Sequence, residues 1–120
     1  LAALQLPFNV HMADAFTAAH HEDRATGDAI SALRFADQEG LSVFASASVL
    51  QGDLVTGLPE DVAAELEGDS PVQRAINFAR SAPAVTSALV GMSQRAHVRE
   101  NLAAGTFDPL GAGSFDAVFE

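Results

Sequence analysis

The sequence predicts an α/β protein with a parallel sheet. Three short apolar runs, rich in β-branched and aromatic residues, have the character of buried strands: Leu4–Val10, Leu41–Ala47 and Ala84–Val90. A helix-like stretch follows each run, and strands joined through helices pair in parallel because a parallel pair needs a long return connection. The runs are continuous rather than alternating, so both faces of the sheet are expected to be covered.

The helix after the first strand is indicated by apolar spacing. Ala29, Ala32, Leu33 and Ala36 recur at the i, i+3, i+4, i+7 positions of one helical face. Gly40 supplies the stop, since a left-handed residue commonly ends a helix.

The second helix has clear boundaries. Ser70 is the expected N-cap, Pro71 occupies the first helical position, and Pro83 ends the segment. Its apolar face is formed by Val72, Ala75, Ile76 and Ala79.

The third helix is expected to begin after Ser93 as N-cap and to run to about Ala104, with Gly105 beyond its end. Val98 and Leu102 are expected to face inward.

Two further segments complete the chain. The insertion Gln51–Asp69 leaves the second strand and contains a short helix at Pro59–Leu66; loops at the carboxyl ends of such strands commonly carry ligand contacts. Residues 1–105 form the main unit, and the tail 106–120 is expected to be irregular. Three phenylalanines are expected to pack the tail against the main unit: Phe107, Phe115 and Phe119.

Composition excludes several functions. The 120 residues include 16 acidic and 6 basic side chains, for a net charge of −10, which disfavours nucleic acid and anionic membrane as partners. Cysteine is absent, so disulfides and thiolate chemistry are excluded, in keeping with a reducing compartment. No apolar run approaches the about 18 residues that cross a bilayer. A soluble cytoplasmic protein is expected.

Four strings carry a family resemblance: Leu4–Asn9 (LQLPFN), Val43–Gly52 (VFASASVLQG), Thr86–Ser93 (TSALVGMS) and His97–Leu102 (HVRENL). Together they resemble the C-terminal third of the aldo/keto reductases. In that family these strings correspond to strands six, seven and eight of a (β/α)8 barrel. The resemblance therefore implies a partial TIM barrel that consists of the last three β/α units.

The resemblance also implies NADPH, bound in an extended pose across the C-terminal mouth of the barrel. Gln5 would contact the nicotinamide carboxamide. Ser46 stands where many members place a tyrosine that stacks on the nicotinamide ring, and a serine offers no π-face. The pyrophosphate loop corresponds to Ser48, Val49, Leu50 and Gln51.

The adenosine end maps to the third helix. Gly91, Met92 and Ser93 lead into the 2′-phosphate site, and Glu100 with Asn101 correspond to the pair that touches adenine. A helix N-terminus offers unpaired N–H groups to a phosphate, and Arg95 can add charge-assisted bonds. Arg95, His97 and Arg99 form a local basic cluster in an otherwise acidic chain, which favours NADP over NAD.

The chain lacks two residue types that the family needs for catalysis. The family reduces carbonyls with an Asp, Tyr, Lys and His tetrad, and this chain contains no tyrosine and no lysine. The chain is therefore interpreted as the cofactor-holding portion of a reductase of small aldehydes or ketones. The missing N-terminal part of the barrel, in the same or another chain, would supply the tetrad and complete a sheet that three strands cannot close.

Alternatives remain open. The chain could be a non-catalytic module that pairs through its open sheet edges, or the phosphate-binding portion of another barrel family, which would not need the Glu100–Asn101 pair. The run His20–Asp23 is interpreted as a solvated loop rather than a metal site, because adjacent histidines point apart. His11 is interpreted as a structural histidine that could instead face substrate. The carboxylates of residues 60–69 are expected on the exposed face of a short helix.

Overall fold

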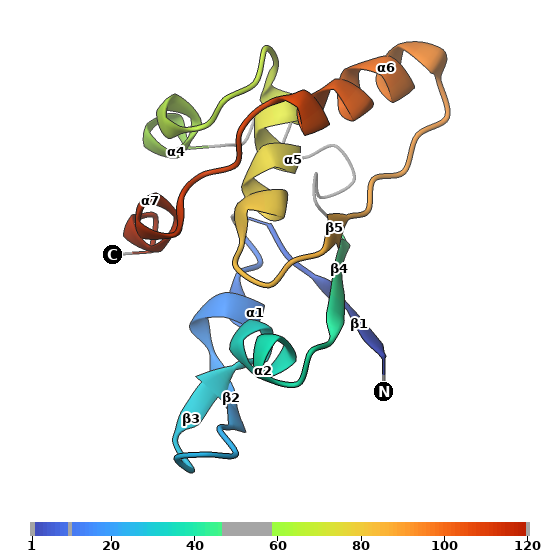
Figure 1. The fold of residues 1–120 in the computed structure, drawn as a ribbon. Helices are drawn as coiled ribbons and strands as arrows, with labels where there is room; N and C mark the ends of the chain where they lie inside the picture. Colours follow the sequence, from blue (N-terminus) through green and yellow to red (C-terminus); the bar gives the residue numbers. More distant parts are fainter. Residues whose placement is uncertain (1, 10, 47–58, 120) are drawn as a thin grey trace.

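A three-stranded parallel sheet organises the computed structural model, which describes residues 2–9, 11–46 and 59–119. The strand order is β1 (Ala3–Pro7), β4 (Ser42–Ser46) and β5 (Ser87–Ala88), with both pairs parallel (Figure 1). The predicted parallel sheet is confirmed. Strand β5 is shorter than expected, although the bond from the N–H of Leu89 to the carbonyl of Ala45, 2.8 Å long, continues the pairing.

One face of this sheet packs against helices. Leu4 lies opposite Val43, and Leu6 lies opposite Ala45. Because parallel partners project to the same side, these four side chains form one apolar surface. Val43 and Ala45 are fully buried in the core.

The other face is not covered by the described helices. Gln5 lies opposite Phe44, and Pro7 lies opposite Ser46. Gln5 and Pro7 are exposed, and Phe44 and Ser46 are half-buried. The expectation that both faces are covered is therefore wrong for the described part of the chain. In a closed barrel, this face would point to the interior.

The first connection contains more than the predicted helix. Helix α1 (Asp14–Thr17) is followed by an antiparallel hairpin of β2 (Ala19–Glu22) and β3 (Ala29–Ser31). The run expected as a loop is therefore partly strand β2, exposed throughout.

Helix α2 (Ala32–Gln38) confirms the predicted helix, although Ala29 lies in β3. Ser31 caps it by accepting a hydrogen bond from the N–H of Arg34. Leu33 and Ala36 are buried, and Gly40 has the predicted left-handed conformation, with φ at +67°.

Helix α5 (Pro71–Ser81) confirms the second predicted helix. Ser70 is its N-cap, and its hydroxyl accepts from the N–H of Gln73 at 3.3 Å. The short helix predicted in the insertion is α4 (Glu60–Glu65). Its carboxylates at residues 60, 61 and 65 are exposed, as predicted.

Helix α6 (Arg95–Ala103) differs from expectation at both its start and its face. Gln94 rather than Ser93 is the N-cap, and its side chain makes no capping bond. Val98 and Leu102 are 36% and 67% exposed, so the inward orientation expected for them is wrong. No residue of α6 is buried. A 3-10 helix, η2 (Ala104–Thr106), follows directly.

The tail contains helix α7 (Ala112–Ala117), which was not predicted from its glycine-rich sequence. Tertiary packing overrides the weak helix propensity of this segment. The ring of Phe115 is fully buried and lies 5.2 Å from that of Phe78 and 5.4 Å from that of Phe119. The predicted packing of the tail is confirmed for Phe115 and Phe119 but is not shown for Phe107, and the irregular structure predicted for the tail is wrong over α7.

Candidate functional site

Two candidate residues lie on the uncovered face of the sheet. Gln5 is in the middle of β1, opposite Phe44, and Ser46 is at the carboxyl end of β4, two residues beyond Phe44. The carbonyl of Ser46 accepts a 3.0 Å hydrogen bond from the N–H of Phe8, which ties it to the end of β1. Their side chains can therefore meet a group that enters from the open face.

The predicted pyrophosphate loop cannot be placed. Ser48, Val49, Leu50 and Gln51 lie outside the described residues.

The start of α6 forms the second group of candidates. Gly91, Met92 and Ser93 are exposed in the connection from β5, and Arg95 is the first residue of the helix. The first backbone hydrogen bond of α6 runs from the N–H of Val98 to the carbonyl of Gln94. The three preceding N–H groups of the helix are therefore available to an anion.

Basic side chains gather in the first turns of α6. Arg95, His97 and Arg99 are all exposed. The ion pair that the described residues do contain, between Arg24 and Glu39 at 3.0 Å, lies elsewhere. Within the described part of the chain, the guanidinium groups of Arg95 and Arg99 have no ion-pair partner, and free N–H groups beside them have the chemistry that a phosphate monoester requires.

The far end of α6 offers a different chemistry. Asn101 is half-buried, and its Oδ1 is a buried acceptor with no hydrogen-bond partner among the described residues. An orphaned acceptor of this kind is costly unless a donor fills it. The atom is covered by the chain itself, so a donor from outside reaches it only when the surrounding side chains move. The start of α6 thus has groups suited to a phosphate, and its far end carries an acceptor that no described residue satisfies.

Two residues that the sequence analysis did not single out hold α6 against α5. Gln73 donates from Nε2 to the carbonyl of Glu100 at 2.9 Å, and Arg80 donates from Nη1 to the carbonyl of Ala104 at 3.2 Å. A signal for Gln73 was present in the sequence, because Ser-x-x-Gln is the pattern of a capping box. For Arg80 no local pattern pointed to the contact.

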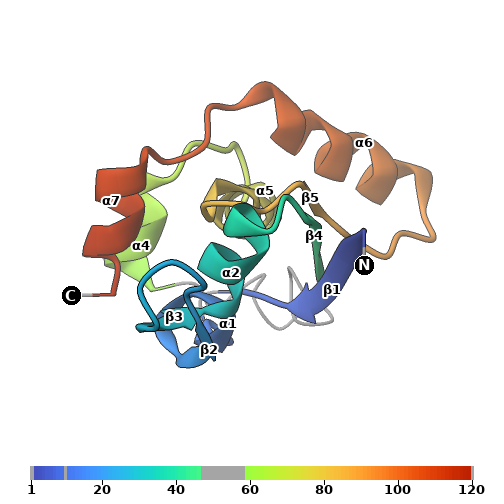
Figure 2. The same cartoon turned by 60° about the horizontal axis from the view of Figure 1, so that its bottom comes forward.

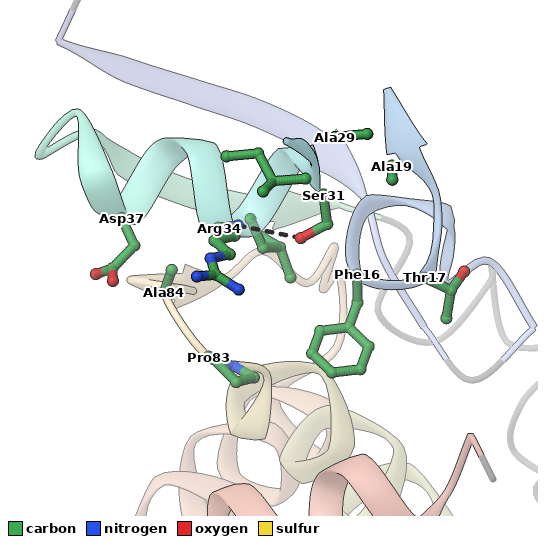
Figure 3. A pocket seen from close by; sticks show the side chains of 11 residues that line it. Phe16, Thr17, Ala19, Ala29, Ser31, Arg34, Asp37, Pro83 and Ala84 are labelled. Atoms are coloured by element: carbon green, nitrogen blue, oxygen red, sulfur yellow. Dashed lines mark hydrogen bonds between the residues drawn. The ribbon is translucent and has the colours of Figure 1, made fainter. Parts of the chain in front are cut away.

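A separate cavity lies apart from these candidate residues. It has a volume of about 690 Å³ and lies among α1, the hairpin, α2 and the turn after α5. Figure 3 shows Phe16 and Pro83 on one side of it, with Arg34 and Asp37 of α2 at its border. None of its lining residues is a candidate for cofactor binding. The candidate residues of β1, of β4 and of the start of α6 lie outside this cavity.

The remaining candidates are the run His20–Asp23 and His11, whose backbone is held in a turn. No group of three or more potential metal ligands occurs in the described ranges. The N–H of His11 donates to Oδ1 of the buried Asn9 at 2.8 Å, in a turn that Met12 shares. Within the same ranges, no helix has the length and apolar character to span a bilayer.

Asp23 organises the tip of the hairpin. Its carboxylate accepts from the side chain of Gln38 at 2.8 Å and from the N–H of Ala25 at 2.8 Å. The bond from Gln38 is the main cause that holds the pKa of Asp23 below its usual value, with the bond from Ala25 next, although burial opposes the shift. This carboxylate stabilises the hairpin and is distant in sequence from the candidate residues.

Comparisons with solved structures give the fold. An aldo-keto reductase from Bacillus halodurans in its holo form matches 99% of this chain with a TM-score of 0.64 at 17% identity. An aldo-keto reductase from Klebsiella pneumoniae in complex with NADPH matches 98% with a TM-score of 0.66 at 15% identity. No protein-family model and no curated protein matches the sequence.

The match covers only part of those proteins. This chain spans 42% of the Bacillus structure and 38% of the Klebsiella structure. At such low identity the likeness establishes the fold alone. The chain has the fold of part of an aldo-keto reductase barrel, as the sequence predicted.

Proposed function

We propose that this chain is the NADPH-holding portion of a reductase that acts on small aldehydes or ketones. The observation that carries the proposal is the start of α6. It presents free N–H groups and the unpaired guanidinium of Arg95 on a fold that resembles, over 98% of its length, part of a reductase solved with NADPH. The 2′-phosphate of NADPH, absent from NADH, would bind there.

The adenine and the nicotinamide of the cofactor would contact the other candidate residues. Asn101 and Glu100 would take the adenine, and the covered Oδ1 of Asn101 would become accessible to it through a local movement of α6. Gln5 on the uncovered face would meet the nicotinamide carboxamide, and Ser46 would lie beside the ring without stacking on it. When bound, NADPH supplies the hydride, and these residues orient it.

The proton donor would come from elsewhere. The chain has no tyrosine and no lysine, so it cannot itself supply the donor and the cation that tune such a reduction. Strands β1 and β5 each have a neighbour on one side only among the described strands, and one face of the sheet is open. We infer that the missing barrel strands occupy both edges, in the same or a separate chain.

A fragment of the cofactor tests the proposal on the chain as it is. Adenosine 2′,5′-bisphosphate contains the groups assigned to α6 and lacks the nicotinamide. Titration followed by NMR is expected to shift the amide signals of residues 91–101. Adenosine 5′-monophosphate is expected to bind at least about tenfold more weakly, because it has no 2′-phosphate. Equal affinity for the two nucleotides would contradict the assignment.

A second candidate function rests on the two unpaired sheet edges. A non-catalytic module could pair through β1 and β5 with another copy or with a different protein. Mass measurement under native conditions distinguishes the two. A stable self-associated form that does not respond to the bisphosphate would favour the module.

A further inference from the structure

Helix α6 carries the proposed adenosine site without being fixed by apolar packing. None of its side chains is buried, and all residues from 91 to 99 are exposed. Figures 1 and 2 show α6 extending along the outside of the molecule from its contact with α5. A helix that is exposed on most sides needs another means of holding its position, because a small displacement of a binding group is costly.

The buried side chain of Gln73 provides that means. Gln73 is only 6% exposed, and both ends of its amide are used. Its Oε1 accepts from the N–H of Asp69 at 2.8 Å, and its Nε2 donates to the carbonyl of Glu100 at 2.9 Å. The amide can adopt only this orientation, since a flip would place donor against donor and acceptor against acceptor.

We propose that Gln73 is a positioning residue that fixes the part of α6 around Glu100 and Asn101, which is proposed to contact the adenine. This inference rests on the proposed function. The carbonyl that Gln73 holds belongs to Glu100, one residue before Asn101 with its orphaned acceptor. Gln73 touches no part of the proposed ligand and acts through the backbone of α6.

The two hydrogen bonds of Gln73 can be separated by substitution. Its acceptor binds the N–H of Asp69, one residue before the N-cap of α5, and a glutamate carboxylate can accept that bond equally well. Its donor holds α6, which glutamate cannot do. Gln73→Glu therefore keeps the first role and loses the second, whereas Gln73→Met loses both at similar size.

Hydrogen exchange of the full chain tests the contact itself. Amides of α6 are expected to exchange about tenfold faster in both variants, because their openings no longer break the bond to Glu100. Amides of α5 are expected to change only in Gln73→Met. If Gln73→Glu leaves the exchange of α6 at the parent rate, Gln73 merely caps α5 and the inference is overturned.

Affinity for adenosine 2′,5′-bisphosphate tests the consequence. Both variants are expected to bind it at least about fivefold more weakly than the parent chain does. Pro71→Glu is the control for added charge, since Pro71 is exposed, lies two residues away and does not touch α6 through a hydrogen bond. Loss of affinity in Pro71→Glu equal to that in Gln73→Glu would assign the effect to charge and contradict positioning.

The outcomes separate this inference from the proposed function. Failure of the parent chain to bind the bisphosphate would overturn the proposed function together with the ligand-positioning role. Binding by the parent that both variants retain unchanged would overturn the inference alone.

Discussion

The guanidinium of Arg80 donates a 2.7 Å hydrogen bond to the backbone carbonyl of Phe107. The same nitrogen, Nη1, also lies within hydrogen-bond distance of the carbonyl of Ala104 and of Oδ1 of Asn77. Arg80 thus brings a cation to the carbonyls at the end of α6 and η2, where the helix dipole is negative. Together with Gln73 it fixes the exposed helix to the buried α5.

Replacement of Arg80 is expected to destabilise the chain. Arg80→Met keeps much of the apolar stem and removes the charged donors, so the free energy of unfolding should fall by about 2 kcal/mol. Urea denaturation measures the change. Arg99→Met, at an exposed position on α6, is the control and should change it by less than about 0.5 kcal/mol. Equal effects would contradict the role given to Arg80.

The aromatic core makes a second prediction. Phe78 is fully buried and lies against Phe8 and Phe115, with ring centroids 6.0 Å and 5.2 Å away. Phe78→Ala should cost about 3–5 kcal/mol. Phe44→Ala removes the same ring from the uncovered face and should cost about 1 kcal/mol in this chain. Similar costs would mean that the second face is covered in solution.

Replacing Gly40 or Gly68 by alanine is expected to destabilise the chain for different reasons. Gly40 has φ at +67° with no atom within 4 Å of an added Cβ, so Gly40→Ala should cost about 1 kcal/mol from backbone strain alone. At Gly68, φ is +150° and an added Cβ would lie 3.0 Å from Cγ of Arg74 and 3.2 Å from Cβ of Gln73.

Gly68→Ala should therefore cost more than Gly40→Ala, by about 1 kcal/mol or more, because crowding adds to strain. It should also speed amide exchange in α6, since one of the two crowded neighbours, Gln73, is the residue that holds Glu100. Thermal denaturation and hydrogen exchange measure the two effects. A cost at Gly68 no greater than at Gly40 would show that the segment relaxes freely.

The hairpin should make stability depend on pH. The pKa of Asp23 is lowered in the folded chain, chiefly by the bond from Gln38, so the folded state prefers the carboxylate. Its contribution is complete above the unfolded pKa of about 4 and is lost as the pH falls through the lower, folded value.

Asp23→Asn should remove that part of the acid dependence and lower stability at pH 7. Unfolding curves collected from pH 7 down to pH 2 measure it. Asp28→Asn, at an exposed position in the same turn, is the control, with an expected change below about 0.5 kcal/mol at pH 7. An unchanged acid slope in Asp23→Asn would contradict the assignment.

The sequence predicted the repeating β/α order because its signals are local. Ser70, Pro71 and Gly40 mark helix ends through their own backbone chemistry, and the structure confirms each. It could not predict the hairpin β2–β3 or helix α7, whose formation depends on contacts distant in the chain, such as the packing of Phe115 on Phe78.

The same distinction holds for the site. Candidate residues in α6 were identified from a resemblance, and the structure places them together on one helix. The inward orientation expected for Leu102 was wrong because helical spacing describes a face without specifying what covers it. The contact of Gln73 with Glu100 spans 27 positions, and no local pattern predicts its second half.

Binding of NADPH and NADH by a protein in which the remaining barrel strands accompany this chain tests the central claim most directly. Since this chain has no tryptophan or tyrosine, the emission of the reduced nicotinamide can report binding with no contribution from its own residues. Arg95→Ala is expected to weaken NADPH by about tenfold or more and NADH by less than about twofold, because only NADPH carries the 2′-phosphate. Equal loss for both cofactors would contradict the claim that α6 holds that phosphate.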